Sequence, residues 1–245
     1  MRIAVISDIH GNLPALEAVM DDLARRNVER ILCLGDLIGK GPNTREVIDI
    51  CRETCEVVVQ GNWDEGIYSA SVRLKTAGPE GIGERTRWYI NSASPEQLAY
   101  LGSLPHSVEV CLGDKLIRLF HAHPVNFNRY FADSPIENRL ELFEGGDADA
   151  QADVAVYADI HTAYMQVLRG RHLVNVGSVG NPLDINQASY VIFEGDESDD
   201  AAFAVQFIRV KYDIEKAILL AKQHGVPDLE GYINELRYAK YFRRM

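Results

Sequence analysis

Carboxylate, imidazole and carboxamide side chains recur along this sequence, each close behind a short apolar run. Carboxylate oxygens and imidazole nitrogens in one set are ligands of Mn²⁺, Fe, Zn²⁺ or Co²⁺, whereas Ca²⁺ prefers oxygen alone and soft centres use thiolates. No cluster is diagnostic by itself, because Asp-x-His is common and Gly-Asp is usually a turn. Five clusters in succession predict a metal centre: Asp8-Ile9-His10, Gly35-Asp36, Gly61-Asn62, His121-Ala122-His123 and Asp159-Ile160-His161.

The apolar runs before the first three clusters alternate with helical patterns. We expect strands at residues 3–7, 31–34 and 57–59, and helices at residues 13–24 and 46–51. This alternation predicts parallel strand pairing, with helices on the faces of the sheet. Because the carboxyl ends of parallel strands meet at one edge, the polar clusters should converge there.

The second half of the chain changes to a mostly β pattern and ends in two helical patterns. Gly113-Asp114 between two apolar runs is typical of a hairpin turn, and the acidic stretch 194–200 is expected to be a solvated loop. We predict one α/β (α+β) domain over residues 1–245, with two packed sheets and helices outside. The further strands are expected at 108–112, 116–120, 154–157, 164–168, 172–176, 188–193 and 203–210, and the further helices at 83–104 (in two pieces), 214–224 and 229–241.

Aromatic residues recur near helical spacing in the last predicted helix. This spacing favours a core face or a dimer interface over a platform for stacking bases, so a homo-oligomer is possible. The residues concerned are Tyr232, Tyr238, Tyr241 and Phe242.

The charge balance restricts the partners. The chain has 25 Lys and Arg against 36 Asp and Glu, a net charge of −11, which argues against an extended nucleic-acid or membrane-binding surface. No run approaches the roughly 20 apolar residues of a membrane helix. A carboxylate already at Asp8 is too early for a secretory signal, so we expect a cytoplasmic protein.

The order of the clusters resembles that of the calcineurin-like metallophosphoesterases. Residues 35–43 (GDLIGKGPN), 174–182 (VNVGSVGNP) and 209–215 (RVKYDIE) look like the small prokaryotic phosphodiesterase branch of that superfamily, so the resemblance covers nearly the whole chain. It implies a four-layer αββα sandwich of two mixed β-sheets flanked by helices. It also implies a dinuclear centre of divalent transition metals, Mn²⁺ first, with Fe, Zn, Co or Ni as alternatives.

The resemblance also implies roles for the clustered residues. The first metal would be held by Asp8, His10, Asp36 and His161, and Asp36 would bridge to a second metal held by Asn62 and His121. The implied reaction is direct attack of a metal-bridging hydroxide on phosphorus, without a covalent enzyme intermediate.

Two positions depart from the superfamily pattern. Trp63 stands where a catalytic histidine is usual, and His123 is the natural replacement donor unless it is a surface histidine. Asp159 stands where the first histidine of Gly-His-x-His is usual. We expect Asp159 to ligate the second metal; the alternative is that it points away and leaves that metal weakly held.

The expected substrate is a small phosphate ester or nucleotide, and a phosphodiester is favoured. Lys40 and Arg129 lie close behind motif residues and could contact its phosphate, unless they are simply solvated. One alternative is a catalytically impaired scaffold that binds protein partners; another is a phosphomonoesterase or protein phosphatase with the same centre. An exposed Trp63 would favour the scaffold, whereas a Trp63 packed beneath the metal loop would favour the enzyme.

Overall fold

Two five-stranded sheets form the centre of the protein. The structure, a computed structural model, describes residues 1–144, 151–195 and 202–241. The strand order of the first sheet is β10 (Ala204–Val210), β9 (Ala188–Glu194), β1 (Arg2–Ile6), β2 (Arg30–Cys33) and β3 (Val57–Val58). That of the second is β4 (Ser107–Leu112), β5 (Lys115–Phe120), β6 (Val154–Tyr157), β8 (Arg171–Asn175) and β7 (Tyr164–Leu168).

Both sheets are mixed, and each has a parallel centre. In the first sheet β1, β2 and β3 are parallel, while β9 is antiparallel to both β1 and β10. In the second, β5, β6 and β8 are parallel, with β4 and β7 antiparallel at the edges. The parallel strands of each sheet therefore end on one side, where the polar clusters follow them.

Alternation along each strand separates two cores. On β1, Ile3 and Val5 face the second sheet, whereas Ala4 and Ile6 face the helices. Successive side chains of a strand point to opposite faces, so a strand buried on both faces is a continuous apolar run. Leu119 of β5 completes the layer between the sheets.

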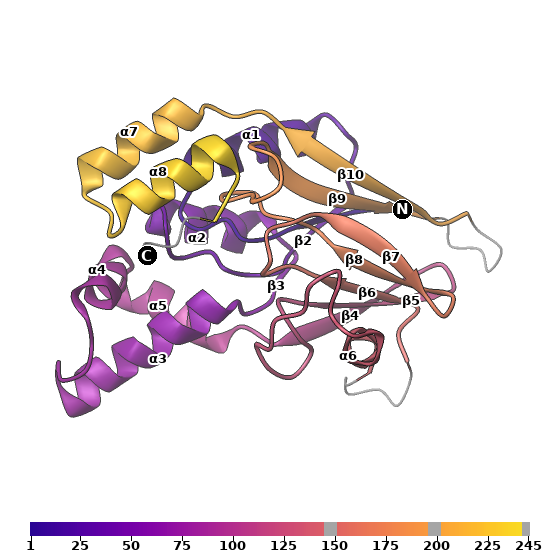
Figure 1. Cartoon of the computed structure of the whole chain (residues 1–245), viewed down its shortest axis with the longest axis horizontal. Helices are drawn as coiled ribbons and strands as arrows, with labels where there is room; N and C mark the ends of the chain where they lie inside the picture. Colours follow the sequence, from indigo (N-terminus) through magenta and orange to yellow (C-terminus); the bar gives the residue numbers. More distant parts are fainter. Residues whose placement is uncertain (145–150, 196–201, 242–245) are drawn as a thin grey trace.

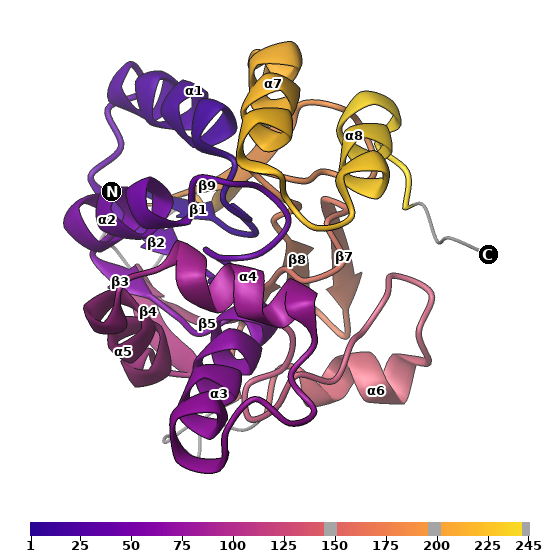
Figure 2. The same cartoon turned by 90° about the vertical axis from the view of Figure 1, so that its left-hand side faces the viewer.

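Helices cover the outer faces of both sheets, as Figures 1 and 2 show. Over the second sheet lies the short α6 (Ile136–Glu141), beside the cluster that contains Phe120 and Tyr157. The order of layers confirms the expected αββα sandwich. The helices on the side of the first sheet are α1 (Leu13–Ala24), α2 (Thr44–Thr54), α3 (Asn62–Ala77), α4 (Glu84–Ser92), α5 (Pro95–Ser103), α7 (Ile214–His224) and α8 (Leu229–Tyr238).

Helices α3 and α6 were not expected from the sequence. The carboxylate of Asp64 accepts a hydrogen bond from the Gly61 N–H at 3.0 Å, which caps α3 directly behind β3. The predicted acidic loop 194–200 lies largely outside the described residues. No helix in the described ranges is long and apolar enough to cross a membrane.

The layer between the sheets should carry much of the stability. Leu119 is completely buried there, so Leu119→Ala should lower the free energy of unfolding by about 2–5 kcal/mol. Urea unfolding followed by circular dichroism measures this. The matched control is Val167→Ala on β7, where Val167 is 59% exposed and the change should cost less than about 1 kcal/mol. Equal losses in both variants would contradict this account of the core.

Candidate metal centre

The turns behind the strands hold their polar residues in an unusual backbone conformation. A left-handed φ costs a residue with a side chain roughly 1–2 kcal/mol, and such strain collects at functional sites. Most of the predicted ligands adopt it. They are Asp8 (φ 52°), His10 (φ 50°), Asp36 (φ 53°), Asp159 (φ 64°) and His161 (φ 58°).

Asp8, His10 and His161 form a first buried group with the spacing of metal ligands. The His161 Nε2 lies 3.2 Å from Asp8 Oδ1, and the His10 Nε2 lies 3.7 Å from it. The two Nε2 atoms are 3.1 Å apart. Two nitrogens that both bind the same metal ion at about 2.0–2.1 Å can have this separation.

Backbone carbonyls fix the orientation of all three histidines. Nδ1 lies 3.1 Å from the Ile38 carbonyl oxygen in His10, 2.8 Å from that of Leu34 in His121, and 2.6 Å from that of Asn181 in His161. Because a carbonyl oxygen only accepts, each Nδ1 is assigned the proton and each Nε2 a lone pair. Two lone pairs facing each other at 3.1 Å repel unless a cation lies between them.

Asp36 and His121 join Asp8 in a second group. Asp36 Oδ2 lies between two imidazoles, 3.5 Å from His10 Nε2 and 3.6 Å from His121 Nε2, and its role as a bridging carboxylate stays a prediction. Asp8 Oδ1 and His121 Nε2 of this group are buried without a hydrogen-bond partner, as is Asn62 Oδ1 at the start of α3, whose ligation stays a prediction. Leaving such groups unpaired costs about 1–3 kcal/mol each, so the donor set fits two divalent ions.

The loop around Asp36 is held by hydrogen bonds to Trp63 and Asp64, at the start of α3. Asp36 Oδ1 accepts the Trp63 N–H at 2.8 Å, which leaves Oδ2 facing the centre. Asp64 in turn accepts the backbone N–H groups of Asp36 and Leu37 at 2.8 and 3.0 Å. Burial and the nearby carboxylates of Asp8 and Asp64 raise the pKa of Asp36; bound cations reverse this effect by stabilising the anion.

The imidazoles act on Asp8 in the opposite sense. Burial alone would raise the pKa of Asp8, but positive charge on the neighbouring imidazoles of His161, His121 and His10 lowers it below its usual value. Where the Nε2 lone pairs bind metal instead, the cations supply this positive charge. Asp8 is therefore an anion at neutral pH, as a metal ligand must be.

Asp159 lies beside the second group, but Arg129 contacts both of its oxygens. Asp159 Oδ1 is 3.8 Å from His121 Nε2. Arg129 donates to the two carboxylate oxygens at 2.6 and 2.7 Å, and this hydrogen bonding raises the pKa of the guanidinium. The structure thus places Asp159 next to the metal ligands, and its ligation stays a prediction.

The other predicted site residues fall in two places. Lys40 lines the pocket beside the centre, and its Nζ lies 2.6 Å from Glu235 Oε2. His123 is not among the pocket-lining residues; its ring stacks on Tyr130 at 5.7 Å, and its Nδ1 accepts the Val125 N–H at 3.2 Å. Its role as proton donor stays a prediction.

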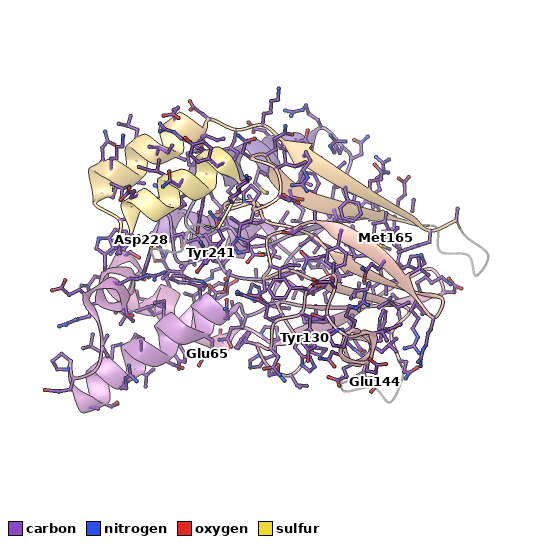
Figure 3. The ribbon with its side chains drawn as sticks, viewed as in Figure 1. Glu65, Tyr130, Glu144, Met165, Asp228 and Tyr241 are labelled. Atoms are coloured by element: carbon purple, nitrogen blue, oxygen red, sulfur yellow. The ribbon has the colours of Figure 1, made fainter. Side chains whose placement is uncertain are left out.

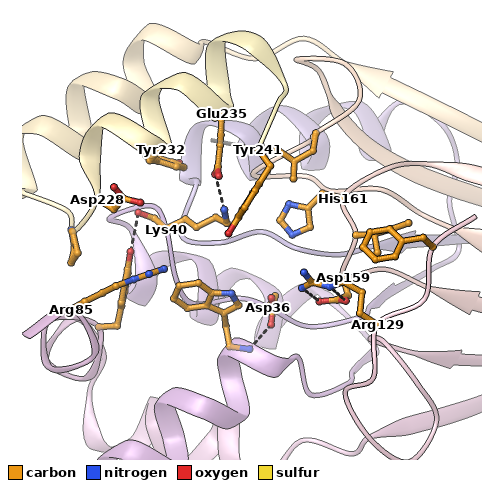
Figure 4. A pocket seen from close by; sticks show the side chains of 16 residues that line it. Asp36, Lys40, Arg85, Arg129, Asp159, His161, Asp228, Tyr232, Glu235 and Tyr241 are labelled. Carbon is orange, nitrogen blue, oxygen red and sulfur yellow. Dashed lines mark hydrogen bonds and ion pairs between the residues drawn. The ribbon is translucent and has the colours of Figure 1, made fainter. Parts of the chain in front are cut away.

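A pocket of about 410 Å³ opens beside Asp36 and His161 (Figure 4). Asp228 and Tyr241, on either side of α8 in the sequence, lie between the C-terminal helices and α3 and α4 (Figure 3). The described lining residues are Asp36, Lys40, Trp63, Arg85, Tyr89, Arg129, Phe131, Asp159, Ile160, His161, Leu183, Pro227, Asp228, Tyr232, Glu235 and Tyr241.

The sequence did not predict the contribution of α4 and the C-terminal segment to this pocket. Tyr232 is buried, as a core residue should be, yet it also lines the pocket, and Tyr241 is 62% exposed there. Assigning both to a core or dimer face was therefore incomplete, and Phe242 lies outside the described residues. Arg85 and Glu235 carried no motif that could have identified them.

Trp63 is half-buried: its ring packs against the loop at Gly39 and also lines the pocket. Its ring meets the edges of His10 and Tyr89, with centroids 5.8 and 5.6 Å apart. A Cβ at Gly39 would lie 2.5 Å from the indole, so only glycine lets the loop lie this close. The guanidinium of Arg85 lies over the ring at 4.9 Å.

A family model described as the calcineurin-like phosphoesterase superfamily domain matches residues 1–198. The chain belongs to this superfamily. It is 32% identical over 258 aligned positions, covering 94% of this chain and 95% of the relative, to an uncharacterised protein of Methanocaldococcus jannaschii. Superfamily centres are generally dinuclear, in agreement with the two ligand groups found here.

Solved structures show the same fold. A metallophosphoesterase from Sphaerobacter thermophilus is similar with a TM-score of 0.77 and 27% identity, over 98% of this chain and 99% of that one. A hypothetical protein from Pyrococcus horikoshii OT3 is similar with a TM-score of 0.74 and 21% identity, over 98% and 99%. Both likenesses extend beyond residue 198, into the C-terminal helices.

Metal binding should stabilise the fold through Asp8, which belongs to both ligand groups. Free Mn²⁺ at 100 times its dissociation constant should add about 2.7 kcal/mol per site and raise the melting temperature above that in EDTA. Asp8→Asn should lose most of this increase, whereas Asp114→Asn, in the exposed β4–β5 turn, should keep it. Differential scanning calorimetry measures all three proteins. A full increase in Asp8→Asn would contradict the assigned centre.

Proposed function

We propose that the protein is a metal-dependent phosphodiesterase that hydrolyses a small phosphate ester or nucleotide. The observation that carries this proposal is a buried set of unpartnered ligand atoms that borders a pocket through Asp36 and His161. Two divalent ions, Mn²⁺ first, would supply an activated water and polarise the phosphoryl oxygens. The close packing of Trp63 against Gly39 of the metal loop and against His10 supports this proposal over the scaffold alternative.

Charge in the pocket favours a diester over a monoester. A phosphate monoester carries a charge near −2 at neutral pH, since its second pKa is about 6, whereas a diester carries −1. Two of the pocket's cations are already engaged, Lys40 by Glu235 and Arg129 by Asp159. Besides the metal ions, Arg85 is then the remaining cationic side chain among the described lining residues, so less protein charge is available for a dianion than for a monoanion. The volume of about 410 Å³ suits a small molecule better than a phosphoprotein.

The chain's own residues have separate tasks in this proposal. Asp36 holds the centre together through Oδ2, while Trp63 fixes its other oxygen. Arg129, half exposed beside Asp159, is placed to contact a phosphate oxygen through an N–H group not used by Asp159. Lys40, which also lines the pocket, would contact the substrate through an N–H group not used by Glu235.

The first test is release of p-nitrophenol with Mn²⁺. We expect bis-p-nitrophenyl phosphate to be hydrolysed with a higher kcat/KM than p-nitrophenyl phosphate. Asp36→Asn should abolish hydrolysis without unfolding the protein, because the asparagine Oδ1 can still accept the Trp63 N–H. Asp114→Asn is the matched control and should retain activity. Turnover retained in Asp36→Asn, or a preference for the monoester, would contradict the proposal.

The role of His123 has its own test. Its place outside the pocket lining leads us to expect only a small change of kcat in His123→Ala, with bis-p-nitrophenyl phosphate as substrate. If His123 protonates the leaving group, as the sequence suggested, kcat should instead fall by about 10²–10⁴-fold. Arg129→Ala, measured in parallel, should raise KM.

A further inference from the structure

The C-terminal helix α8 reaches the metal centre from outside the matched family region. That region ends at residue 198, whereas α8 spans Leu229–Tyr238. Its Glu235 is buried, with only 6% of the side chain exposed. A buried carboxylate is costly unless it is paired and hydrogen-bonded, so its partners indicate what holds it there.

Both side-chain partners of Glu235 donate to the same oxygen. Lys40 Nζ lies 2.6 Å from Glu235 Oε2, and Asn181 Nδ2 lies 3.1 Å from it. Figure 4 shows Glu235 pointing from α8 toward Lys40, with His161 nearby. The carboxylate thus connects the loop behind β2 with the segment behind β8.

Asn181 also contacts His161, a predicted metal ligand. Its backbone oxygen and its Oδ1 lie 2.6 and 3.1 Å from His161 Nδ1. Its backbone N–H donates to Ser178 Oγ, which donates to the Asp8 carbonyl, both at 2.8 Å. Asn181 is therefore attached to two ligands of the first group.

Glu235 determines which way the Asn181 amide points. A carboxylate accepts only, so the amide NH₂ faces Glu235 and Oδ1 faces His161. Without the carboxylate the amide can flip and present its NH₂ to the His161 Nδ1–H, where two donors repel. A flipped amide would disfavour the tautomer whose Nε2 lone pair faces the centre.

We propose that Glu235 is a positioning residue through which α8 orients His161 for metal binding, with Asn181 as the intermediate. The inference rests on the metal centre of the proposed function. Mutation of a residue that hydrogen-bonds a metal-ligating histidine typically lowers metal affinity by about 10–100-fold. The Asn181 carbonyl still holds His161 Nδ1 when Glu235 is lost, so we expect about 10-fold, at the lower end of this range.

The test is titration of the metal-free protein with Mn²⁺ by isothermal titration calorimetry, with no substrate present. Glu235→Ala should weaken the Mn²⁺ site that contains His161 by about 10-fold. Glu235→Gln should bind Mn²⁺ nearly as well as the wild type, because its single carbonyl oxygen can accept both hydrogen bonds that now converge on Oε2. Wild-type Mn²⁺ affinity in folded Glu235→Ala would overturn the proposal.

Arg237→Ala is the matched control on the same helix. Arg237 pairs with Glu215 of α7 at an exposed surface, 2.8 Å apart, so its loss perturbs α8 without touching Asn181. Mn²⁺ affinity should not change in this variant. A loss as large as that of Glu235→Ala would overturn the proposal, because it would assign the effect to general loosening of α8.

Asn181→Ala keeps the test decisive if Glu235→Ala does not fold. It removes the amide while the Lys40–Glu235 pair and the backbone carbonyl remain. Mn²⁺ affinity should fall by about 10-fold here too, and unchanged affinity would overturn the proposal. These results are independent of catalysis: the expected affinities without any phosphodiester hydrolysis would exclude the proposed function and support the positioning role.

Discussion

The imidazoles of His10, His121 and His161 direct their Nε2 lone pairs into the same buried volume as the carboxylates of Asp8 and Asp36. Without a cation this arrangement is unfavourable, since the lone pairs repel and the burial of two neighbouring anions is costly. The fold must hold these groups together against that repulsion. Bound divalent ions remove this repulsion, because each lone pair and each carboxylate then interacts with a positive charge.

The fold meets this constraint with hydrogen bonds to the backbone. Each histidine is held through Nδ1 by a carbonyl on another segment, so the ligands of one turn depend on the placement of the next. The Asp64 carboxylate accepts hydrogen bonds from three backbone N–H groups of the loop around Asp36. The left-handed residues follow from the same need, because a sharp turn directly behind each strand points the side chain back over the sheet edge.

The pocket beside the centre has two walls. The turns behind the strands form the metal side, whereas α4 and the C-terminal segment form the opposite wall. Trp63 connects the two, because its ring contacts His10 on one side and Arg85 on the other. The superfamily centre is therefore combined with a wall whose C-terminal part, but not α4, lies outside the matched family region.

The sequence by itself predicted the two mixed sheets, the αββα order of layers and the candidate ligands, of which Asp8, His10, Asp36, His121 and His161 lie together in the structure. Those features depend on local patterns: apolar runs of strand length, turn residues behind them, and an order of Asp, His and Asn that resembles one superfamily. Tertiary structure alone decided that Arg129 engages Asp159, that His123 stacks on Tyr130, and that Glu235 accepts a hydrogen bond from Asn181. No local pattern encodes such contacts, because they join side chains brought together only when the C-terminal helices and the loops between strands have packed.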